Sequence, residues 1–308
     1  MTDNELILFD RLEVIRKTNE KYDLEHNAYI SFSGGKDSTV LHYLMDEALP
    51  GNHIPRVFIN TGIEYLAIVK FVREMAANDD RFEIVTPKVK IKEMLEKDGY
   101  PFKSKQHARW LGLYQKNGRT QSVKNYLGEG EKQLFRPCPE MLKYQFDDSF
   151  KIPVSDKCCL KMKEKPSEKW GKENKRKTSL TGIRKEEGGR RQTIPCMAIR
   201  GGKLNKFHPL SVVTEQWEEW YIKTRKIKLC ELYYSPYNFE RTGCKGCPFA
   251  LHLQEELDTL ALYLPAERKQ CEYIWAPVYA EYRRLGYRLR KDDGQISLFE
   301  WANHVNDI

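Results

Sequence analysis

The chain has 308 residues, of which 40% are hydrophobic and 31% charged, and its formal net charge is +8. This length is enough to bury one large core, or one core with an appendage. No apolar run is long enough to cross a bilayer, and acidic residues spread through positions 1–20 are unlike a signal peptide, so we expect neither membrane insertion nor secretion. Eight cysteines without an export signal indicate a reducing cytoplasm, where clustered cysteines more often hold metal or do redox work than form disulfides.

Strand-like and helical patterns alternate in the first third of the chain. A short amphipathic helix is predicted within residues 1–20, with apolar positions at Leu6, Ile7, Phe9, Leu12 and Ile15. Predicted strands at 29–32, 56–60 and 82–85 are followed by predicted helices at 39–47, 68–77 and 91–96. The alternation predicts an α/β fold, in which helices flank a parallel sheet and ligands bind at the carboxyl ends of its strands.

This alternation ends near residue 99. Residues 99–151 are polar and irregular apart from a predicted helix at 106–116, and a returning strand at 179–184 and a helix at 214–225 follow. The tail is predicted to hold helices at 250–264 and 266–285, with Pro265 starting the second and Pro277 kinking or splitting it. We therefore divide the chain into an N-terminal helix (1–25), an α/β domain with a polar insertion at about 99–151 (26–249), and a helical C-terminal region (250–308).

A phosphate-binding pattern follows the first predicted strand: Ser33-Gly34-Gly35-Lys36-Asp37-Ser38. Two glycines allow a tight turn that approaches an anion, and the helix that follows offers unpaired N–H groups and the positive end of its dipole. The serines add hydroxyl donors, Lys36 adds a mobile charge, and Asp37 suits a Mg²⁺ ion beside the phosphates. The pattern predicts a nucleotide site in the α/β domain.

Positive charge is concentrated in residues 157–177, which hold nine Lys or Arg and three Glu, a net charge of +6. Such a patch favours an anionic partner, either a nucleic acid backbone or a phosphorylated substrate. A solvated lysine-rich loop explains the charge equally well.

Four cysteines form a second pattern, Cys158-Cys159 and, 84 residues further on, Cys244-x-x-Cys247. Four thiolates suit Zn²⁺ or a [4Fe–4S] cluster, and the Cys-x-x-Cys pair converges on one centre from a tight turn. Adjacent side chains diverge, which favours the separate iron corners of a cluster over one small ion. Of the other cysteines, Cys196 is a candidate substrate-facing thiol, although a structural role is the simpler interpretation.

The hexapeptide at residues 33–38 resembles the pyrophosphatase loop of the adenine-nucleotide α-hydrolase (ATP pyrophosphatase, PP-loop) superfamily. Over residues 29–249 the chain resembles, more narrowly, the phosphoadenosine-phosphosulfate (PAPS) reductase-like family. The further matching segments are Asn60-Thr61-Gly62-Ile63-Glu64-Tyr65, Gly182-Ile183-Arg184 with Glu187 and Arg191, His208-Pro209-Leu210 with Val213-Thr214 and Tyr221-Ile222, and Gly243-Cys244-Lys245-Gly246-Cys247-Pro248.

The resemblance implies an adenine-nucleotide α-hydrolase-like, Rossmann-like fold and a set of site residues. The phosphates would be held by Ser33, Gly34, Gly35, Lys36, Asp37 and Ser38. Thr61 and Gly62 would line the nucleotide site, and Arg184 and Arg191 would contact the anionic part of the substrate. Lys36, Asp37 and Arg184 are the implied catalytic residues. The cysteine pattern resembles the iron–sulfur adenosine-phosphosulfate reductases, which implies a [4Fe–4S] cluster on Cys158, Cys159, Cys244 and Cys247. Gly188 departs from the family pattern, which usually has Ser there.

The reductases of the family carry a nucleophilic cysteine in a Glu-Cys-Gly-x-His setting near the C-terminus, whereas no cysteine follows Cys271 here. We therefore expect an enzyme that uses ATP and Mg²⁺ to adenylate a substrate, for sulfur transfer to a nucleic acid. The tRNA or DNA would contact residues 157–177, and a sulfur-donor protein is a further expected partner. One alternative is a sulfonucleotide reductase that uses Cys196 or an external thiol. Another is a nucleotide-binding subunit of a modification or defence complex, without activity of its own.

Overall fold

The structure is a computed structural model that describes residues 1–132, 134 and 136–291. The chain forms two compact units. Unit 1 comprises Met1–Ile91 and Cys159–Lys245, and unit 2 comprises Lys92–Cys158 and Gly246–Ile308. The predicted helical region at 250–308 therefore extends beyond the described residues, and the division at residues 25 and 249 stays a prediction.

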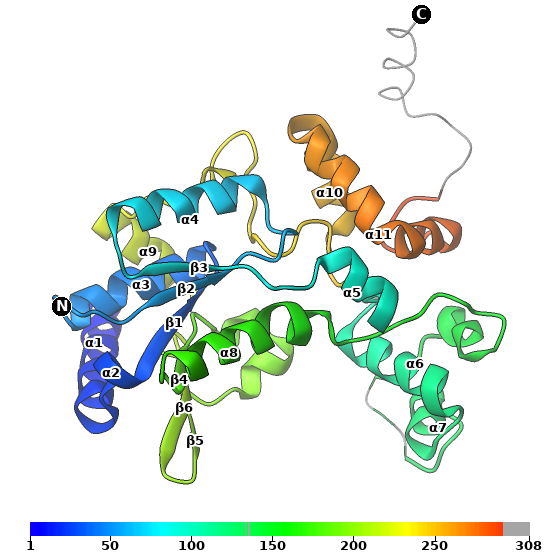
Figure 1. The fold of residues 1–308 in the computed structure, drawn as a ribbon, viewed down its shortest axis with the longest axis horizontal. Coiled ribbons are helices and arrows are strands. Elements are labelled where there is room, and N and C mark those ends of the chain that lie inside the picture. Colours follow the sequence, from blue (N-terminus) through cyan, green and yellow to red (C-terminus); the bar gives the residue numbers. More distant parts are fainter. Residues whose placement is uncertain (133, 135, 292–308) are drawn as a thin grey trace, which may run out of the picture. The chain divides into compact units, whose positions relative to one another are not determined.

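A six-stranded sheet forms the centre of unit 1, with the strand order β3-β2-β1-β4-β6-β5 (Figure 1). The strands are β1 (Ala28–Phe32), β2 (Arg56–Ile59), β3 (Phe82–Val85), β4 (Thr178–Leu180), β5 (Met197–Arg200) and β6 (Lys203–Phe207). Every pair is parallel except β5 with β6. The predicted α/β class is confirmed, and the predicted strands at 29–32, 56–60 and 82–85 correspond to β1, β2 and β3.

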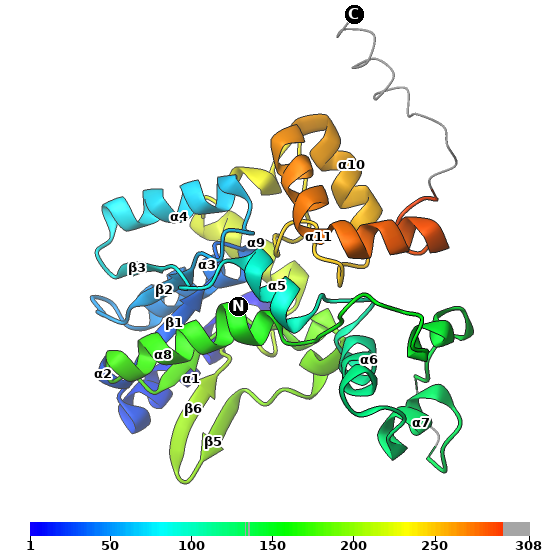
Figure 2. The same ribbon diagram turned by 45° about the vertical axis from the view of Figure 1, so that its right-hand side comes forward.

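Helices cover both faces of this sheet (Figures 1 and 2). The helices of unit 1 are α1 (Asp3–Tyr22), α2 (Leu24–Asn27), α3 (Lys36–Ala48), α4 (Leu66–Asn78), α8 (Lys165–Glu173) and α9 (Glu215–Arg225). On one face, the ring of Phe82 meets His42 of α3 at 5.2 Å between centroids. On the other face, Tyr29 meets Trp170 of α8 at 5.2 Å, and Trp170 donates from Nε1 to Glu83 at 2.7 Å. Alternate residues of each strand point to opposite faces, so both helix layers bury apolar side chains of the same strands.

The N-terminal helix α1 has a buried stripe that differs from the predicted one. Leu12 and Ile15 are buried as expected, but Leu6 and Phe9 are 52% and 57% exposed. The stripe runs instead through Leu8, Leu12 and Ile15, at the i, i+4, i+7 spacing of one helix face.

Two elements of unit 1 are absent from the sequence prediction. Residues 157–177, for which a solvated loop was one interpretation, include a π-helical turn at Leu160–Glu164 followed by α8. Strands β5 and β6 form an antiparallel hairpin after the short 3₁₀ segments Lys185–Glu187 and Gly189–Thr193. In both places the apolar residues are too sparse to show the period of a helix or of a strand.

Unit 2 is helical within the part that the structure describes. Its helices are α5 (Ile91–Asp98, whose first residue belongs to unit 1), α6 (Lys105–Asn117), α7 (Gln121–Leu127), α10 (Leu253–Tyr263) and α11 (Pro265–Leu285). Helix α11 starts at Pro265 as predicted and continues through Pro277. The fully buried His107 contacts the Tyr126 hydroxyl at 3.0 Å and Gln145 Oε1 at 2.8 Å. No helix in the described ranges is long and apolar enough to span a membrane.

Candidate functional site

The predicted nucleotide residues of unit 1 follow neighbouring strands. The loop at residues 33–38 follows β1, Thr61 and Gly62 follow β2, and Arg184 follows β4. Since β1 lies between β2 and β4 and all three are parallel, these segments leave the sheet at the same carboxyl edge. The topology therefore brings together the residues that the sequence pattern assigns to one site.

The glycines of the phosphate loop are required by its geometry. Gly34 has φ +73°, and a Cβ there would lie 2.8 Å from Ile68 and 3.0 Å from Val72 of α4. Ser33 Oγ and Ser38 Oγ are 3.0 Å apart, and Ser38 Oγ donates to the carbonyl of Gly35 at 2.9 Å. These contacts fix the loop in a tight turn on the helix that follows it.

Helix α3 begins at Lys36 and directs its first N–H groups toward the loop. Within the described residues the N–H groups of Asp37 and Ser38 have no backbone or side-chain acceptor, as is usual in a first helical turn. An anion that reaches this turn meets two open donors and the positive end of the helix dipole. The loop can therefore bind a phosphate group.

Carboxylates already neutralise the cations of the loop. Lys36 Nζ lies 2.8 Å from Glu215 Oε1 and 3.6 Å from Glu218 Oε2, both on α9. Arg184 Nε donates to Asp37 Oδ1 at 2.9 Å, and its NH2 lies 3.5 Å from Glu218 Oε2. Burial lowers the pKa of Lys36, but the hydrogen bond to Glu215 and the charge of Glu218 outweigh it, so the net shift is upward.

Glu218 is the most unusual group at the site. Its side chain is fully buried, and neither carboxylate oxygen accepts a hydrogen bond within the described part of the chain. Burial and the negative charge of Asp37 raise the pKa of Glu218 to about 8, against the opposing effects of Arg184 and Lys36. The sequence analysis treated this region only as a helix, and no local pattern distinguishes Glu218 from the exposed acids of α9.

A second group of charges surrounds Glu187, which follows Arg184 in the chain. Its side chain is 6% exposed and forms ion pairs with Arg191 and Arg241 through one oxygen. Burial and the positive charge of Arg241 lower the pKa of Arg191. The contact of Arg191 with the anionic part of a substrate stays a prediction, and Arg241, which shares Glu187 with Arg191, is a residue that the sequence analysis did not single out.

The loop after β2 connects to one of the predicted metal ligands. Thr61 donates to Glu64 from its N–H at 2.8 Å, and Glu64 lies 3.1 Å from Lys163 Nζ. Burial lowers the pKa of Lys163, but the negative charges of Cys244 and Glu64 raise it more, so the net shift is upward. Lys245 donates its N–H to the carbonyl of Ile63 at 3.0 Å. The Cys244 segment is thereby held against the predicted nucleotide loop.

The four predicted metal ligands are divided between the units. Cys159 and Cys244 belong to unit 1, and Cys158 and Cys247 to unit 2. Burial raises the pKa of Cys244, and the nearby Cys159 contributes in the same direction while Lys163 opposes it. Within the described residues, no group of three or more His, Cys, Asp or Glu side chains is arranged to hold a metal ion.

Cys196 lies at the same end of the sheet as the phosphate loop. It precedes β5, whose first residue pairs with the last residue of the neighbouring β6, Met197 with Phe207. Its thiol donates to the carbonyl of His208 at 3.5 Å, and His208 Nδ1 lies 2.6 Å from the Thr181 hydroxyl.

Three lysines of the basic segment at 157–177 lie on one face of α8. Lys165, Lys169 and Lys172 are exposed and lie at i, i+4 and i+7 of α8. The opposite side of α8 buries Trp170 and Gly171 against the sheet. Lys163, by contrast, lies in the π-helical turn before α8 and contacts Glu64 and Cys244.

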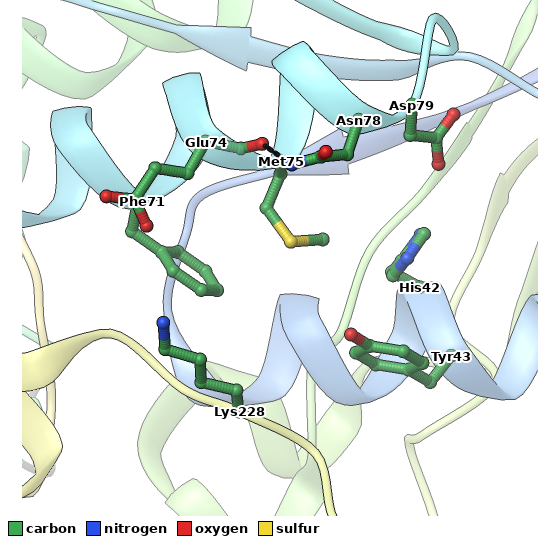
Figure 3. A pocket seen from close by; sticks show the side chains of 8 residues that line it. All are labelled: His42, Tyr43, Phe71, Glu74, Met75, Asn78, Asp79 and Lys228. Carbon is green, nitrogen blue, oxygen red and sulfur yellow. Dashed lines mark hydrogen bonds between the residues drawn. The ribbon is translucent and has the colours of Figure 1, made fainter.

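A further pocket of about 310 Å³ lies between α3 and α4 (Figure 3). Phe71 and Met75 form its apolar wall, and Tyr43 and the ammonium of Lys228 point into it (Figure 3). None of the loop residues 33–38 lines it, so this pocket is separate from the phosphate loop.

Comparison with known proteins gives one family match. A family model described as "Phosphoadenosine phosphosulfate reductase domain" matches residues 27–135 and 139–250. The uncharacterized protein MJ0973 of Methanocaldococcus jannaschii is 25% identical over 248 residues, which are 79% of this chain and 47% of that protein. The chain thus spans about half the length of the curated relative it matches.

Three solved structures were also compared. A phosphoadenylyl-sulfate (PAPS) reductase from Candida auris in a phosphate complex is 18% identical, with a TM-score of 0.45, over 76% of this chain and 87% of that one. The U34-tRNA thiolase NcsA from Methanococcus maripaludis with its [4Fe-4S] cluster is 17% identical, with a TM-score of 0.39, over 92% of this chain and 80% of that one. The NH3-dependent NAD synthetase from Campylobacter jejuni is 13% identical, with a TM-score of 0.37, over 92% of this chain and 97% of that one.

The packing of Gly34 on α4 can be tested by substitution. Gly34→Ala should lower the free energy of unfolding by about 2 kcal/mol or more, because the added methyl group meets Ile68 at 2.8 Å in a left-handed backbone conformation. Gly51→Ala is the matched control, since Gly51 has φ +75° but nothing within 4 Å of the added Cβ. Urea denaturation measures both variants. Equal losses would mean that the loop is not packed on α4.

Proposed function

Because the chain belongs to the phosphoadenosine phosphosulfate reductase domain family, we propose that it is an ATP pyrophosphatase that activates its substrate by adenylation. The observation that carries this proposal is the loop after β1, where the open N–H groups of Asp37 and Ser38 adjoin Lys36 and Arg184. Such donors stabilise the charge that develops on phosphates as a pyrophosphate group leaves. A sulfur nucleophile would then attack the activated carbon of the adenylated substrate and displace AMP.

The site also suits the Mg²⁺ that accompanies ATP. This ion takes oxygen ligands, usually one or two carboxylates together with substrate phosphates. Asp37 acts on the buried Glu218 through its negative charge and through a contact between the two carboxyl groups, so both groups offer oxygens at one place. Asp37 and Glu218 would hold the ion, which neutralises phosphate charge when bound. Its presence would also relieve the repulsion that raises the pKa of Glu218.

Removal of the Lys36 charge tests the proposed chemistry. Lys36→Met should reduce pyrophosphate release from ATP by about 100-fold or more, because a charge aimed at the phosphates is lost. The assay contains Mg²⁺ and either tRNA or DNA as acceptor. Lys223→Met, on the exposed side of α9, should leave the rate unchanged. The proposal fails if the unaltered protein releases no pyrophosphate with either acceptor, or if the two variants behave alike.

We further propose that Cys158, Cys159, Cys244 and Cys247 hold a [4Fe–4S] cluster. The supporting observations are the interaction of Cys159 with Cys244 in unit 1 and the Lys163 ammonium beside Cys244. A positive charge there would offset the negative charge of a thiolate-ligated cluster. The thiolates would bind iron, and the cluster would hold sulfur or organise the site.

Iron and sulfide analysis after anaerobic purification tests the cluster. The unaltered protein should contain about four irons per chain with an absorption band near roughly 400 nm. Cys244→Ala should lose both signals, whereas Cys230→Ala, which removes a buried cysteine elsewhere in unit 1, should keep them. Stoichiometric zinc, or iron that survives in Cys244→Ala, would contradict the assignment.

A nucleic acid is the acceptor that we propose, bound through the lysines of α8. Their alignment on one exposed face provides the periodic positive charge that a phosphate backbone requires.

Charge removal on α8 tests this contact. Lys165→Gln/Lys169→Gln/Lys172→Gln should weaken tRNA or DNA binding and reduce the slope of log affinity against log salt by about 2 to 3, one unit for each lost phosphate contact. The control removes three lysines elsewhere on unit 1, Lys70, Lys203 and Lys223, all exposed. Unchanged affinity and slope in the α8 variant would exclude this surface as the binding site.

A sulfonucleotide reductase is the second candidate. The position of Cys196 at the carboxyl end of the sheet favours it, because a thiol there faces the same edge as the phosphate loop. Sulfite release from adenosine phosphosulfate that requires Cys196, without pyrophosphate release from ATP, would establish this activity in place of the first.

A further inference from the structure

One donor of the phosphate loop is already occupied by a side chain. The N–H of Lys36 donates to the hydroxyl of Tyr233 at 2.9 Å, whereas the neighbouring N–H groups of Asp37 and Ser38 remain open. A backbone N–H has one hydrogen, so a phosphate oxygen that binds the Lys36 amide must displace Tyr233. The Tyr233 hydroxyl thus occupies the place of a ligand oxygen.

The same hydroxyl holds a second segment. Tyr233 Oη lies 2.7 Å from Thr242 Oγ1, and both groups pack against Gly35, where an added Cβ would lie 3.3 Å from each. Since Tyr233 accepts from Lys36, its own proton is available for Thr242. Thr242 is two residues before Cys244, so one tyrosine joins the phosphate loop to the cysteine segment.

The segment at residues 241–245 has other contacts within unit 1, among them the ion pair of Arg241 with Glu187. Lys245 donates to the carbonyl of Ile63, and Cys244 interacts with Lys163. Residues 238–240 and 243 are exposed or partly exposed. The Thr242 hydroxyl joins this segment to Tyr233 and, through Tyr233, to the Lys36 amide of the phosphate loop.

We propose that Tyr233 is a positioning residue that couples anion binding in the phosphate loop to the Cys244 segment. An anion replaces the tyrosine hydroxyl on the Lys36 amide, and the displaced side chain no longer fixes Thr242. The inference rests on the proposed function only in that the loop binds a phosphate-type anion, and it does not depend on the reaction that follows.

The proposal gives a definite sign for the effect on affinity. Removing the tyrosine hydroxyl removes a competitor, so Tyr233→Phe should bind inorganic pyrophosphate more tightly, by about fivefold, the equivalent of one ordinary hydrogen bond. If the Tyr233 hydroxyl instead stabilised the binding conformation of the loop, Tyr233→Phe would bind pyrophosphate more weakly. Thr242→Val removes the hydrogen bond to Tyr233 that the anion must otherwise break, so by reciprocity this variant should also bind pyrophosphate more tightly than the unaltered protein.

The experiment combines calorimetry of pyrophosphate binding with amide hydrogen exchange of residues 239–245, on the full chain purified anaerobically. In the unaltered protein, pyrophosphate should accelerate exchange in this segment. In Tyr233→Phe and Thr242→Val, exchange should be fast without pyrophosphate and should not respond to it. Tyr234→Phe is the matched control, because it removes a neighbouring tyrosine hydroxyl that accepts from the N–H of Leu229 at 3.1 Å and not from Lys36.

Weaker pyrophosphate binding in Tyr233→Phe, or a response of the segment that persists in Thr242→Val, would overturn the proposal. If Tyr233→Phe does not fold, Thr242→Val still decides it. Absence of pyrophosphate binding in the unaltered protein would overturn both this inference and the proposed function. The protein could also show the expected exchange response to pyrophosphate and yet release no pyrophosphate from ATP. That result would support the role of Tyr233 and reject the proposed ATP pyrophosphatase activity.

Discussion

The buried carboxyl group of Glu218 is the constraint on which the site depends. A buried charge is costly unless opposite charges lie close to it, and here Lys36 and Arg184 lie 3.6 and 3.5 Å away. These three residues come from α9, the start of α3 and the segment after β4. Above its raised pKa of about 8, the ionised Glu218 pairs with both cations and so joins three separate elements around the first turn of α3. Any anion that enters the loop must compete with these carboxylates for the cations, which favours ligands of high charge density.

Local patterns predicted the frame of unit 1 well. The hexapeptide at 33–38 joins β1 to α3, and its chemistry is contained in six consecutive residues, so no tertiary information was needed to recognise it. The alternation of strands and helices likewise follows from short-range periodicity. Helix α8 was missed as an element because its buried side is narrow, formed by Ser167, Trp170 and Gly171 among many lysines. The order of apolar and charged residues in α8 therefore differs little from that of a solvent-exposed loop.

Residues that act through distant contacts could not be predicted. Tyr233 reaches Lys36 across 197 positions of the chain, and Glu215 reaches it across 179. Both stand in stretches with several other tyrosines or glutamates, and only the fold selects one of them. Arg241 was overlooked for the same reason, although it is three residues from a recognised cysteine. The family pattern pointed to the cysteines, whereas the contacts of the residues just before them, Arg241 with Glu187 and Thr242 with Tyr233, depend on the fold.

The hairpin of β5 and β6 has a consequence for the sheet as a whole. An edge strand presents unpaired N–H and C=O groups on which another chain can add a strand. Strand β5 forms one edge, is only four residues long, and shifts its register between Ala198 and Ile199. An intruding strand would lose alignment at this irregularity, and it would also have to bury the exposed Arg200. The hairpin thus discourages edge-to-edge aggregation at the β5 edge of the sheet. Without the hairpin, the parallel strand β4 would be exposed as the edge instead.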